Sequence, residues 1–420
     1  MMDVCYLNDC IEAEQEKLFR YLSKLIQINS ENYGDHGNEE ECAKFIEEWC
    51  NKLGMETELY SPLDIPSFEQ HPDYLEGRHL ENRYNVTARW KGTQDTDALM
   101  IMGHSDTVPI GDLENWSVDP LGGIIKDGKI WGRGSCDDKY ALAAALFVIE
   151  LMQREGFTPK KNLLFTAYSD EEFGGSHGAL AACLRYPCER ILNMDGRFEN
   201  LWHCASGGGV VTYKFHTIET ANSAEYAARA IPVVMDTIKL FAENRLNELS
   251  KNPYYAGSNI PQTSLRYMCV KAGNEGSDLG SGKVDFTFYT DKSKDEIYEE
   301  FTCLEKILAE KLKPLQIVGD GFTFTTRFFH YVYSKPDCDA IRDMCDAAME
   351  AVGKAPIVSG SCLSDLSVIL KYGSDQAFAL GAGRDFSLQG GAHQPDEFIE
   401  CQRLVDFAKV LAAYILKSLG

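Results

Sequence analysis

The feature that most constrains the fold is a regular alternation of short apolar runs with helical patterns in the first half of the chain. Residues 98–103, 163–168 and 191–194 have the length and composition of buried strands. Helical patterns occupy residues 140–153 and 178–184 between them. Strands that alternate with helices in this way predict an α/β domain built on a mainly parallel sheet.

The order of elements changes after residue 207. We expect a strand at residues 210–215, a helix at 224–249, strands at 264–270 and 283–289, and a helix at 296–311. This order predicts an inserted α+β lid whose sheet is mostly antiparallel.

The remaining segments flank the insertion and belong with the α/β domain. They are amphipathic helices at residues 18–26 and 42–53, a helix at 340–352, a strand at 377–380 and a final helix at 401–419. The expected domains are residues 1–207 and 318–420 for the two parts of the catalytic domain, and residues 208–317 for the lid.

Composition and charge exclude several classes of partner. With 41 Lys and Arg against 64 Asp and Glu, the formal net charge of −23 repels nucleic acid and anionic membranes. No apolar segment reaches the roughly 18 to 20 residues that span a bilayer, and the first residues lack a secretory pattern, so we expect a cytosolic protein. The 14 cysteines contain no CxxC pair, which favours free thiols over disulfides or structural zinc.

Small polar clusters follow the predicted strands of the α/β domain. The clusters contain His104 and Asp106, Asp137 and Asp138, Glu171 and Glu172, Asp195, and His393. Taken singly, each has an ordinary structural explanation, such as a helix N-cap, a solvated turn or a buried histidine. However, the carboxyl ends of parallel strands meet at one edge of a sheet. Two imidazoles and three carboxylates at one edge suit two divalent, zinc-like ions with one bridging carboxylate.

Charge arithmetic favours cations in such a cluster. Asp137, Glu172 and Asp195 carry a charge of −3, and without cations they would repel one another. Two divalent ions and a bridging hydroxide bring the sum to zero. A site of this kind lowers the pKa of bound water to about 7 and polarises a carbonyl oxygen, which suits hydrolysis of an amide or ester.

Six motifs in order give the chain a resemblance to a known family. They are Arg83-Tyr84-Asn85-Val86, GHSDTVP from Gly103, WSVDPL from Trp116, GRGSCDDK from Gly132, SDEEFGG from Ser169, and Gly391-Ala392-His393 followed by Asp396-Glu397. The chain resembles the co-catalytic zinc exopeptidases and deacylases, which include acetylornithine deacetylase, succinyl-diaminopimelate desuccinylase, aminoacylases, glutamate carboxypeptidases and dipeptidases. The resemblance extends over nearly the whole sequence and implies an α/β metallopeptidase catalytic domain with an inserted lid.

The resemblance also implies a role for each residue of the cluster. Asp137 would bridge two metal ions, with His104 and Asp195 completing one site and Glu172 and His393 the other. Asp106 would fix the tautomer of the His104 imidazole. The family further implies a cis peptide between Asp137 and Asp138. The metals are expected to be zinc, with cobalt or manganese as alternatives.

Glu171 is the expected general base. Consecutive side chains of an extended segment point to opposite sides, so Glu171 would be free of the metal that Glu172 binds. In the implied mechanism Glu171 takes a proton from the bridging water, the hydroxide attacks the carbonyl, and Glu171 returns the proton to the leaving nitrogen. The substrate would be a dipeptide or an N-acyl amino acid.

The lid departs from the family pattern. His216 is a candidate for the lid histidine of many relatives, and Asn222-Ser223 stands where a His-Ser pair is usual. Residues 284–290 lack the usual arginine, and Tyr289 lies near its place, while Asn274 corresponds to a polar lid residue. The substrate-binding residues therefore stay unassigned.

Two other functions and an oligomeric state stay open. One function is a single-metal aminopeptidase of related fold, which a count of bound ions would distinguish. The other is a catalytically silent metal-binding or small-molecule-binding relative, which would tolerate loss of Glu171. The lid is also the expected surface for a homodimer.

Overall fold

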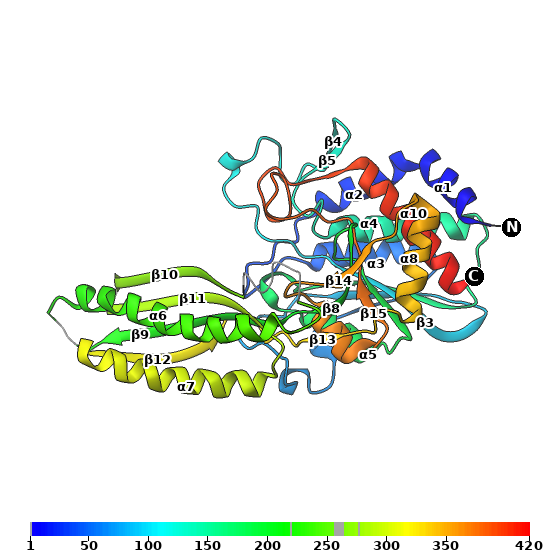
Figure 1. The fold of residues 1–420 in the computed structure, drawn as a ribbon. Coiled ribbons are helices and arrows are strands. Elements are labelled where there is room, and N and C mark those ends of the chain that lie inside the picture. Colours follow the sequence, from blue (N-terminus) through cyan, green and yellow to red (C-terminus); the bar gives the residue numbers. More distant parts are fainter. Residues whose placement is uncertain (1, 219–220, 256–263, 276–277) are drawn as a thin grey trace. The chain divides into compact units, whose positions relative to one another are not determined.

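The structure is a computed structural model that describes residues 2–218, 221–255, 264–275 and 278–420. It divides the chain into two compact units (Figure 1). The first unit comprises Met1–His203, Tyr333–Ser359 and Val368–Gly420, and the second comprises Cys204–Val332 and Gly360–Ser367. Each unit is described by itself.

A large sheet forms the centre of the first unit. Its strand order is β1-β2-β6-β3-β7-β15-β8-β13, with β14 paired to β8. Strand β3 runs parallel to β6 and β7, and β15 runs parallel to β7, which confirms the predicted mainly parallel sheet. The strands are β1 Glu56–Tyr60, β2 Asn85–Trp90, β3 Gln94–His104, β6 Lys161–Tyr168, β7 Arg190–Asn193, β8 Asn200–Ala205, β13 Val332–Tyr333, β14 Ile357–Gly360 and β15 Ala377–Ala379.

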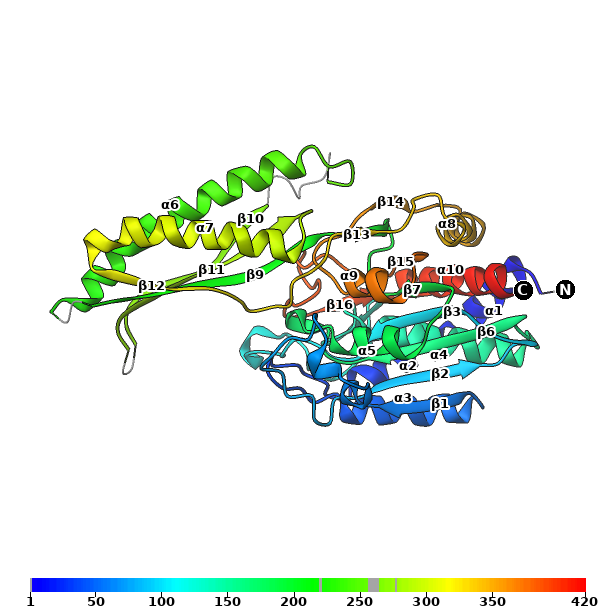
Figure 2. The same ribbon diagram turned by 90° about the horizontal axis from the view of Figure 1, so that it is seen from below.

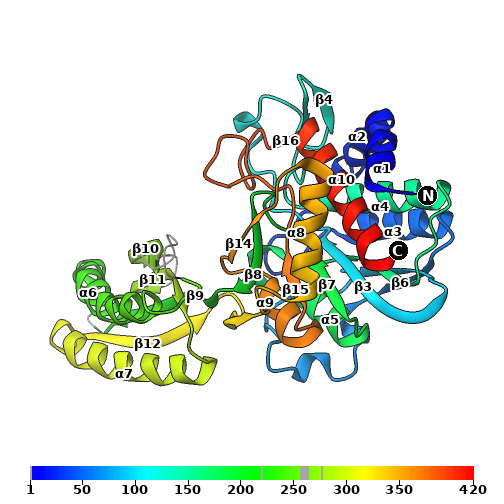
Figure 3. The same ribbon diagram turned by 45° about the vertical axis from the view of Figure 1, so that its right-hand side comes forward.

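Helices surround this sheet, as Figure 2 shows from below. The helices are α1 Val4–Ala13, α2 Gln15–Ile26, α3 Glu40–Lys52, α4 Lys139–Arg154, α5 His177–Arg185, α8 Asp339–Val352 and α10 Cys401–Leu419. The short helix α9 Leu366–Val368 begins in the last segment of the second unit. Helices α8 and α10 run side by side, and the two termini lie close together on this unit (Figure 3). A small sheet adds β4 Ile124–Lys126, β5 Lys129–Trp131 and β16 Phe398–Glu400.

Separate apolar clusters pack the helices against the strands of the main sheet. Leu99 and Ile101 of β3 are fully buried in one apolar cluster with α4 and α10. Leu180 of α5 belongs to a separate cluster with Tyr60 of β1. Helix α4 is buried along most of its length, as the continuous apolar run in its sequence predicts. No helix in the described part of the chain has the length and apolar character needed to cross a membrane.

The second unit is a four-stranded sheet with two long helices (Figure 2). Its strands lie in the order β10-β11-β9-β12, and every neighbouring pair is antiparallel, as predicted. The elements are β9 Gly207–Thr217, α6 Ser223–Leu249, β10 Leu265–Glu275, β11 Asp278–Thr290, α7 Lys294–Leu312 and β12 Ile317–Phe324.

One face of the second sheet packs against its helices. Tyr213 and Phe215 of β9 are buried in a core with residues of α6 and α7, whereas Lys214 and His216 lie on the open face. Strand β12 extends this sheet beyond residue 317, where the sequence analysis ends the lid. The sequence analysis did not predict strand β12. Most of its side chains are exposed or half-buried, so its sequence lacks the apolar run of a buried strand.

A buried charge network ties the sheet to the segment after β6. Arg83 is fully buried and contacts two acids, with Nε 2.8 Å from Glu39 Oε1 and Nη1 2.8 Å from Asp170 Oδ1. Asp170 also pairs with Arg78 at 3.2 Å and with His177 at 2.5 Å. Although burial alone would raise the pKa of Asp170, Arg83 and His177 hold it below its usual value.

Replacing Arg83 with Met should destabilise the first unit strongly. The change leaves Glu39 and Asp170 buried without their main cation, and breaking a buried pair costs about 3–5 kcal/mol. Urea unfolding would measure the loss. Lys44→Met is the matched control, because Lys44 forms an exposed pair with Glu40, and its loss should cost only about 0.3–0.5 kcal/mol. Equal losses in both variants would contradict the assigned role of Arg83.

Candidate metal centre

The structure brings the five predicted ligands together at the carboxyl edge of the main sheet. His104 ends β3, Asp137 precedes α4, Glu172 follows β6, Asp195 follows β7, and His393 lies in the loop before β16. Among the described residues, three groups of three side chains have ligand atoms within 4.8 Å of one another, and one of these groups combines His104 with Glu171 and Glu172. The other two groups are His104, Asp137 and Asp195, and Asp137, Glu172 and His393. These are the two sets that the resemblance implies, and they share Asp137.

The two oxygens of Asp137 face different histidines. Oδ1 lies 3.1 Å from His104 Nε2, and Oδ2 lies 3.1 Å from His393 Nε2. His393 Nε2 is also 3.1 Å from Glu172 Oε2. Imidazole nitrogens and carboxylate oxygens at this spacing are the donors that zinc-like ions prefer, so the residues fit a pair of divalent cations. A carboxylate with one oxygen toward each group suits a bridging position.

The pKa values show an excess of negative charge in this cluster. Burial, reinforced by the charge of Asp137, raises the pKa of Asp195 to about 7. Burial would lower the pKa of His393, but Glu172 and Asp137 raise it to about 12. The pKa of His104 is likewise raised well above its usual value, against the effect of burial, by Asp106, Asp137 and Glu171. The metal-free cluster therefore holds protons where divalent cations would bind.

Asp106 contacts His104 through two groups. Its backbone carbonyl lies 2.9 Å from His104 Nδ1, and its carboxylate lies 3.6 Å from the same nitrogen. The carboxylate also accepts the backbone N–H groups of Glu171 and Glu172, at 3.1 Å and 3.0 Å, and the side-chain amide of Asn32 at 2.8 Å. Asp106 therefore fixes the segment that presents both glutamates.

Glu171 lies within the same cluster. One of its oxygens falls within 4.8 Å of ligand atoms of His104 and Glu172. The expected alternation of side chains is wrong as an explanation, because Glu171 has φ −80° and ψ −51° and Glu172 begins a 3-10 turn. The backbone is not extended here, and the Asp106 contacts with both N–H groups account for the turn.

Two further features of the α4 turn link it to the cluster. The peptide between Asp137 and Asp138 is cis, as the resemblance implies. Tyr140, in the first turn of α4, donates its hydroxyl to the carbonyl of Met194 at 2.7 Å. This bond connects the start of α4 to the residue before Asp195.

Sequence reasoning missed the buried partners of this cluster. Asn32 and Glu39 were not singled out, and Arg83 and Asp170 appeared only within motifs. Polar residues in loops give no periodic signal, so only the strongly buried position of each side chain reveals its role.

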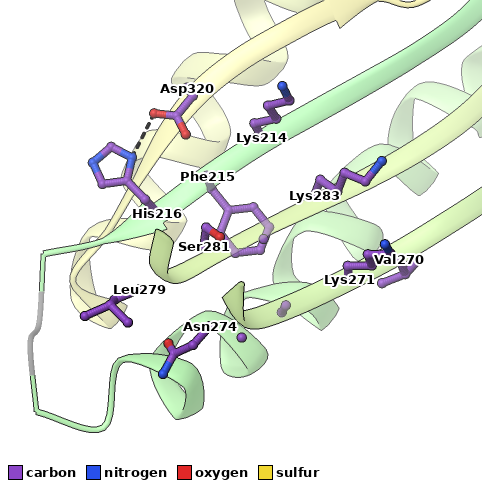
Figure 4. A pocket seen from close by; sticks show the side chains of 13 residues that line it. Lys214, Phe215, His216, Val270, Lys271, Asn274, Leu279, Ser281, Lys283 and Asp320 are labelled. Atoms are coloured by element: carbon purple, nitrogen blue, oxygen red, sulfur yellow. Dashed lines mark hydrogen bonds and ion pairs between the residues drawn. The ribbon is translucent and has the colours of Figure 1, made fainter. Parts of the chain in front are cut away.

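The lid candidates lie in the second unit. His216 of β9 and Asn274 of β10 line a hollow of about 970 Å³ on the open face of its sheet (Figure 4). His216 Nδ1 lies 2.8 Å from Asp320 Oδ1. Asn274 Oδ1 accepts hydrogen bonds from the Ser223 hydroxyl at 3.0 Å and the Gly280 N–H at 2.8 Å. Tyr289 lies near the end of β11, and Asn222 occupies the N-cap position of α6 with φ +61°.

Comparison with known proteins gives a family match. A family profile described as "Peptidase family M20/M25/M40" matches residues 100–417. The chain is 36% identical over 114 residues to a probable carboxypeptidase S-like 2 of Dictyostelium discoideum, covering 27% of this chain and 22% of that protein. It is 26% identical to a succinyl-diaminopimelate desuccinylase of Acinetobacter baylyi, covering 57% of this chain and 61% of that protein. The matched regions thus span less than two thirds of these relatives.

A solved structure gives a match over nearly the full length. The di-peptidase Dug1p of Saccharomyces cerevisiae superposes with a TM-score of 0.72 and 16% identity, covering 99% of this chain and 98% of that one. At 16% identity this likeness shows the fold alone. The shared fold is an α/β unit together with an additional antiparallel unit.

Single-ligand variants should separate the two groups. We expect about two divalent ions per chain in the wild type, about one in His393→Ala and in Asp195→Ala, and almost none in Asp137→Ala, which is shared. Metal analysis after dialysis against dilute zinc measures this. The exposed His36, changed to Ala, is the control and should retain both ions. Equal losses in the His393 and Asp137 variants would contradict a shared bridging residue.

Metal binding should release protons. At neutral pH the metal-free protein carries a proton on His393, whose pKa is about 12, and partly on Asp195, whose pKa is about 7. A cation must displace these protons, so its affinity should rise with pH. Competition by the Asp195 proton ends above about pH 7, whereas competition by the His393 proton continues toward its pKa of about 12. Calorimetric titration with zinc in buffers of different ionisation enthalpy counts the protons. Binding heats that are independent of the buffer would contradict this expectation.

Proposed function

The chain belongs to the peptidase family M20/M25/M40, and we propose that it hydrolyses an amide bond in a small peptide or an N-acyl amino acid. The observation that carries the proposal is the pair of ligand groups that share Asp137. Two overlapping groups favour a two-cation hydrolase over a single-metal aminopeptidase. Small substrates are favoured because the relatives are named a carboxypeptidase and a desuccinylase, and the fold neighbour a dipeptidase.

The proposed metal site consists of His104, Asp137, Glu172, Asp195 and His393. When bound, two divalent cations would polarise the scissile carbonyl and lower the pKa of water. We propose zinc as the native metal, with cobalt or manganese as alternatives, since all three accept this donor set. The backbone carbonyl of Asp106 would hold a proton on His104 Nδ1 and leave Nε2 as the coordinating nitrogen.

Glu171 is the proposed general base. Its carboxylate is close to His104 and Glu172 but is not part of either group that contains Asp137. Glu171 would accept a proton from the attacking water and return it to the leaving nitrogen. Asp106 supports this role because it accepts the Glu171 N–H and so fixes the position of the residue. His216 and Asn274 remain candidates for substrate contact, and a lid-mediated homodimer remains a prediction.

Chelation should abolish the activity. Purified protein, assayed against a panel of dipeptides and N-acyl amino acids, should lose turnover after dialysis with a chelator and regain it with zinc, cobalt or manganese. Release of the free amino acid provides the assay. Full activity in chelator-treated protein of verified metal content below one ion per chain would contradict the proposal.

Glu171→Gln should slow catalysis without loss of metal. Removal of a general base typically lowers kcat by about 10²–10⁴-fold. Metal content and the thermal unfolding temperature should stay at the wild-type values, because Glu171 is not assigned as a ligand. Glu48→Gln, at an exposed position of α3, is the matched control and should leave kcat unchanged. An unchanged kcat in Glu171→Gln would contradict the assignment of Glu171 as the general base.

A further inference from the structure

Two sequence motifs that the proposed reaction does not use meet in the first unit. One is the Trp116–Leu121 run, and the other is the acidic pair Asp396-Glu397 after His393. Glu397 is fully buried, and so, almost completely, is Arg133, which pairs with it at 2.6 Å. Glu397 and Arg133 lie between the segment that carries Asp137 and the segment that carries His393.

Glu397 contacts the segment directly before Asp137 at three points. Its Oε2 accepts from Arg133 Nη1, and its Oε1 accepts from the Cys136 N–H at 2.9 Å. Its backbone carbonyl accepts from the Gly132 N–H, also at 2.9 Å. Because Glu397 follows His393 by four residues and Cys136 precedes Asp137, one side chain joins the segments of two ligands.

Arg133 also contacts two other loops, one that carries His393 and one that contains Pro109 and Trp116. Its guanidinium donates to the backbone carbonyls of Gln394 at 3.2 Å and Pro109 at 3.3 Å, and it lies 5.1 Å from the centre of the Trp116 ring. Asp396 accepts from the backbone and the hydroxyl of Ser117, at 2.7 Å and 2.8 Å. The two unused motifs thus hold the loop that carries His393.

His393 needs such support more than the other ligands do. Its side chain is 45% exposed, against 0% for His104, 4% for Glu172 and 18% for Asp137. Its backbone has φ +65°, a left-handed conformation that is unfavourable for a non-glycine residue. Burial therefore holds the His393 side chain less than it holds these other ligands, and contacts of the loop contribute more to its position.

We propose that Glu397 and Arg133 are positioning residues that hold His393 and Asp137 at the spacing required for one of the two cations. This inference rests on the proposed function. The cation position formed by Asp137, Glu172 and His393 takes two of its three ligands from the segments that the pair joins. The other position takes His104 and Asp195 from the ends of β3 and β7, so it depends less on the pair.

Zinc titration of metal-free protein by calorimetry tests the inference. The wild type should bind two ions. In Glu397→Gln, which keeps an acceptor for Cys136 but loses the charge opposite Arg133, the affinity of one ion should fall about 10–100-fold. The affinity of the other ion should change by less than about threefold. Arg133→Lys, which keeps the charge but loses the forked donors, should give a smaller fall at the same position.

The control is Asp343→Asn, which breaks an ion pair with Arg190 in the same unit, at 2.7 Å, and should keep both affinities. Thermal unfolding of the metal-free variants shows whether each is folded. Wild-type affinities in folded Glu397→Gln and Arg133→Lys, or equal weakening of both ions, would overturn the inference. A wild type that binds fewer than two ions would instead contradict the proposed function.

Discussion

The first unit depends on the cost of gathering carboxylates at a largely buried sheet edge. Asp137 and Glu172 have ligand atoms near both His104 and His393, and Asp195 has one near His104. Like charges in a medium of low dielectric repel strongly. Without cations the cluster reduces this repulsion by binding protons, which is why the pKa of His393 rises to about 12 and that of Asp195 to about 7. Divalent cations would meet the same need with a fixed geometry, so charge compensation links the fold to the chemistry.

Buried ion pairs stand on both sides of this cluster and hold its loops. On one side Arg83 joins Glu39 and Asp170, next to the turn of Glu171 and Glu172. On the other side Arg133 joins Glu397, between the segments of Asp137 and His393. Such pairs add little net stability compared with apolar side chains, but they fix direction and distance well. Loops that must present ligands gain from that geometric precision, whereas the apolar core beneath them supplies most of the stability.

The second unit follows simpler rules. Its sheet packs one face against α6 and α7, and alternation along β9 leaves Lys214 and His216 on the open face (Figure 4). Lys214, Lys283 and Lys271 stand opposite one another on three adjacent strands, with Lys283 paired to Asp285 at 2.7 Å. The His216–Asp320 pair lies beside this row. A polar, hollowed face of this kind can vary among relatives without disturbing the core, which agrees with the departure of this lid from the family motifs.

The sequence by itself determined the alternation of strands and helices, the antiparallel second unit and the set of candidate ligands, because apolar periodicity and strand-end motifs are local signals. Strands β1 and β12 escaped it because most of their side chains are exposed or half-buried. Strand β2 is almost fully buried, but its sequence mixes polar residues such as Asn85 and Thr87 with the apolar ones. Only the tertiary structure decided which atom of Asp106 faces His104, how the turn at Glu171 bends, and that Arg83 and Glu397 lie buried between loops. These features depend on contacts between residues far apart in the chain, and no local pattern records such contacts.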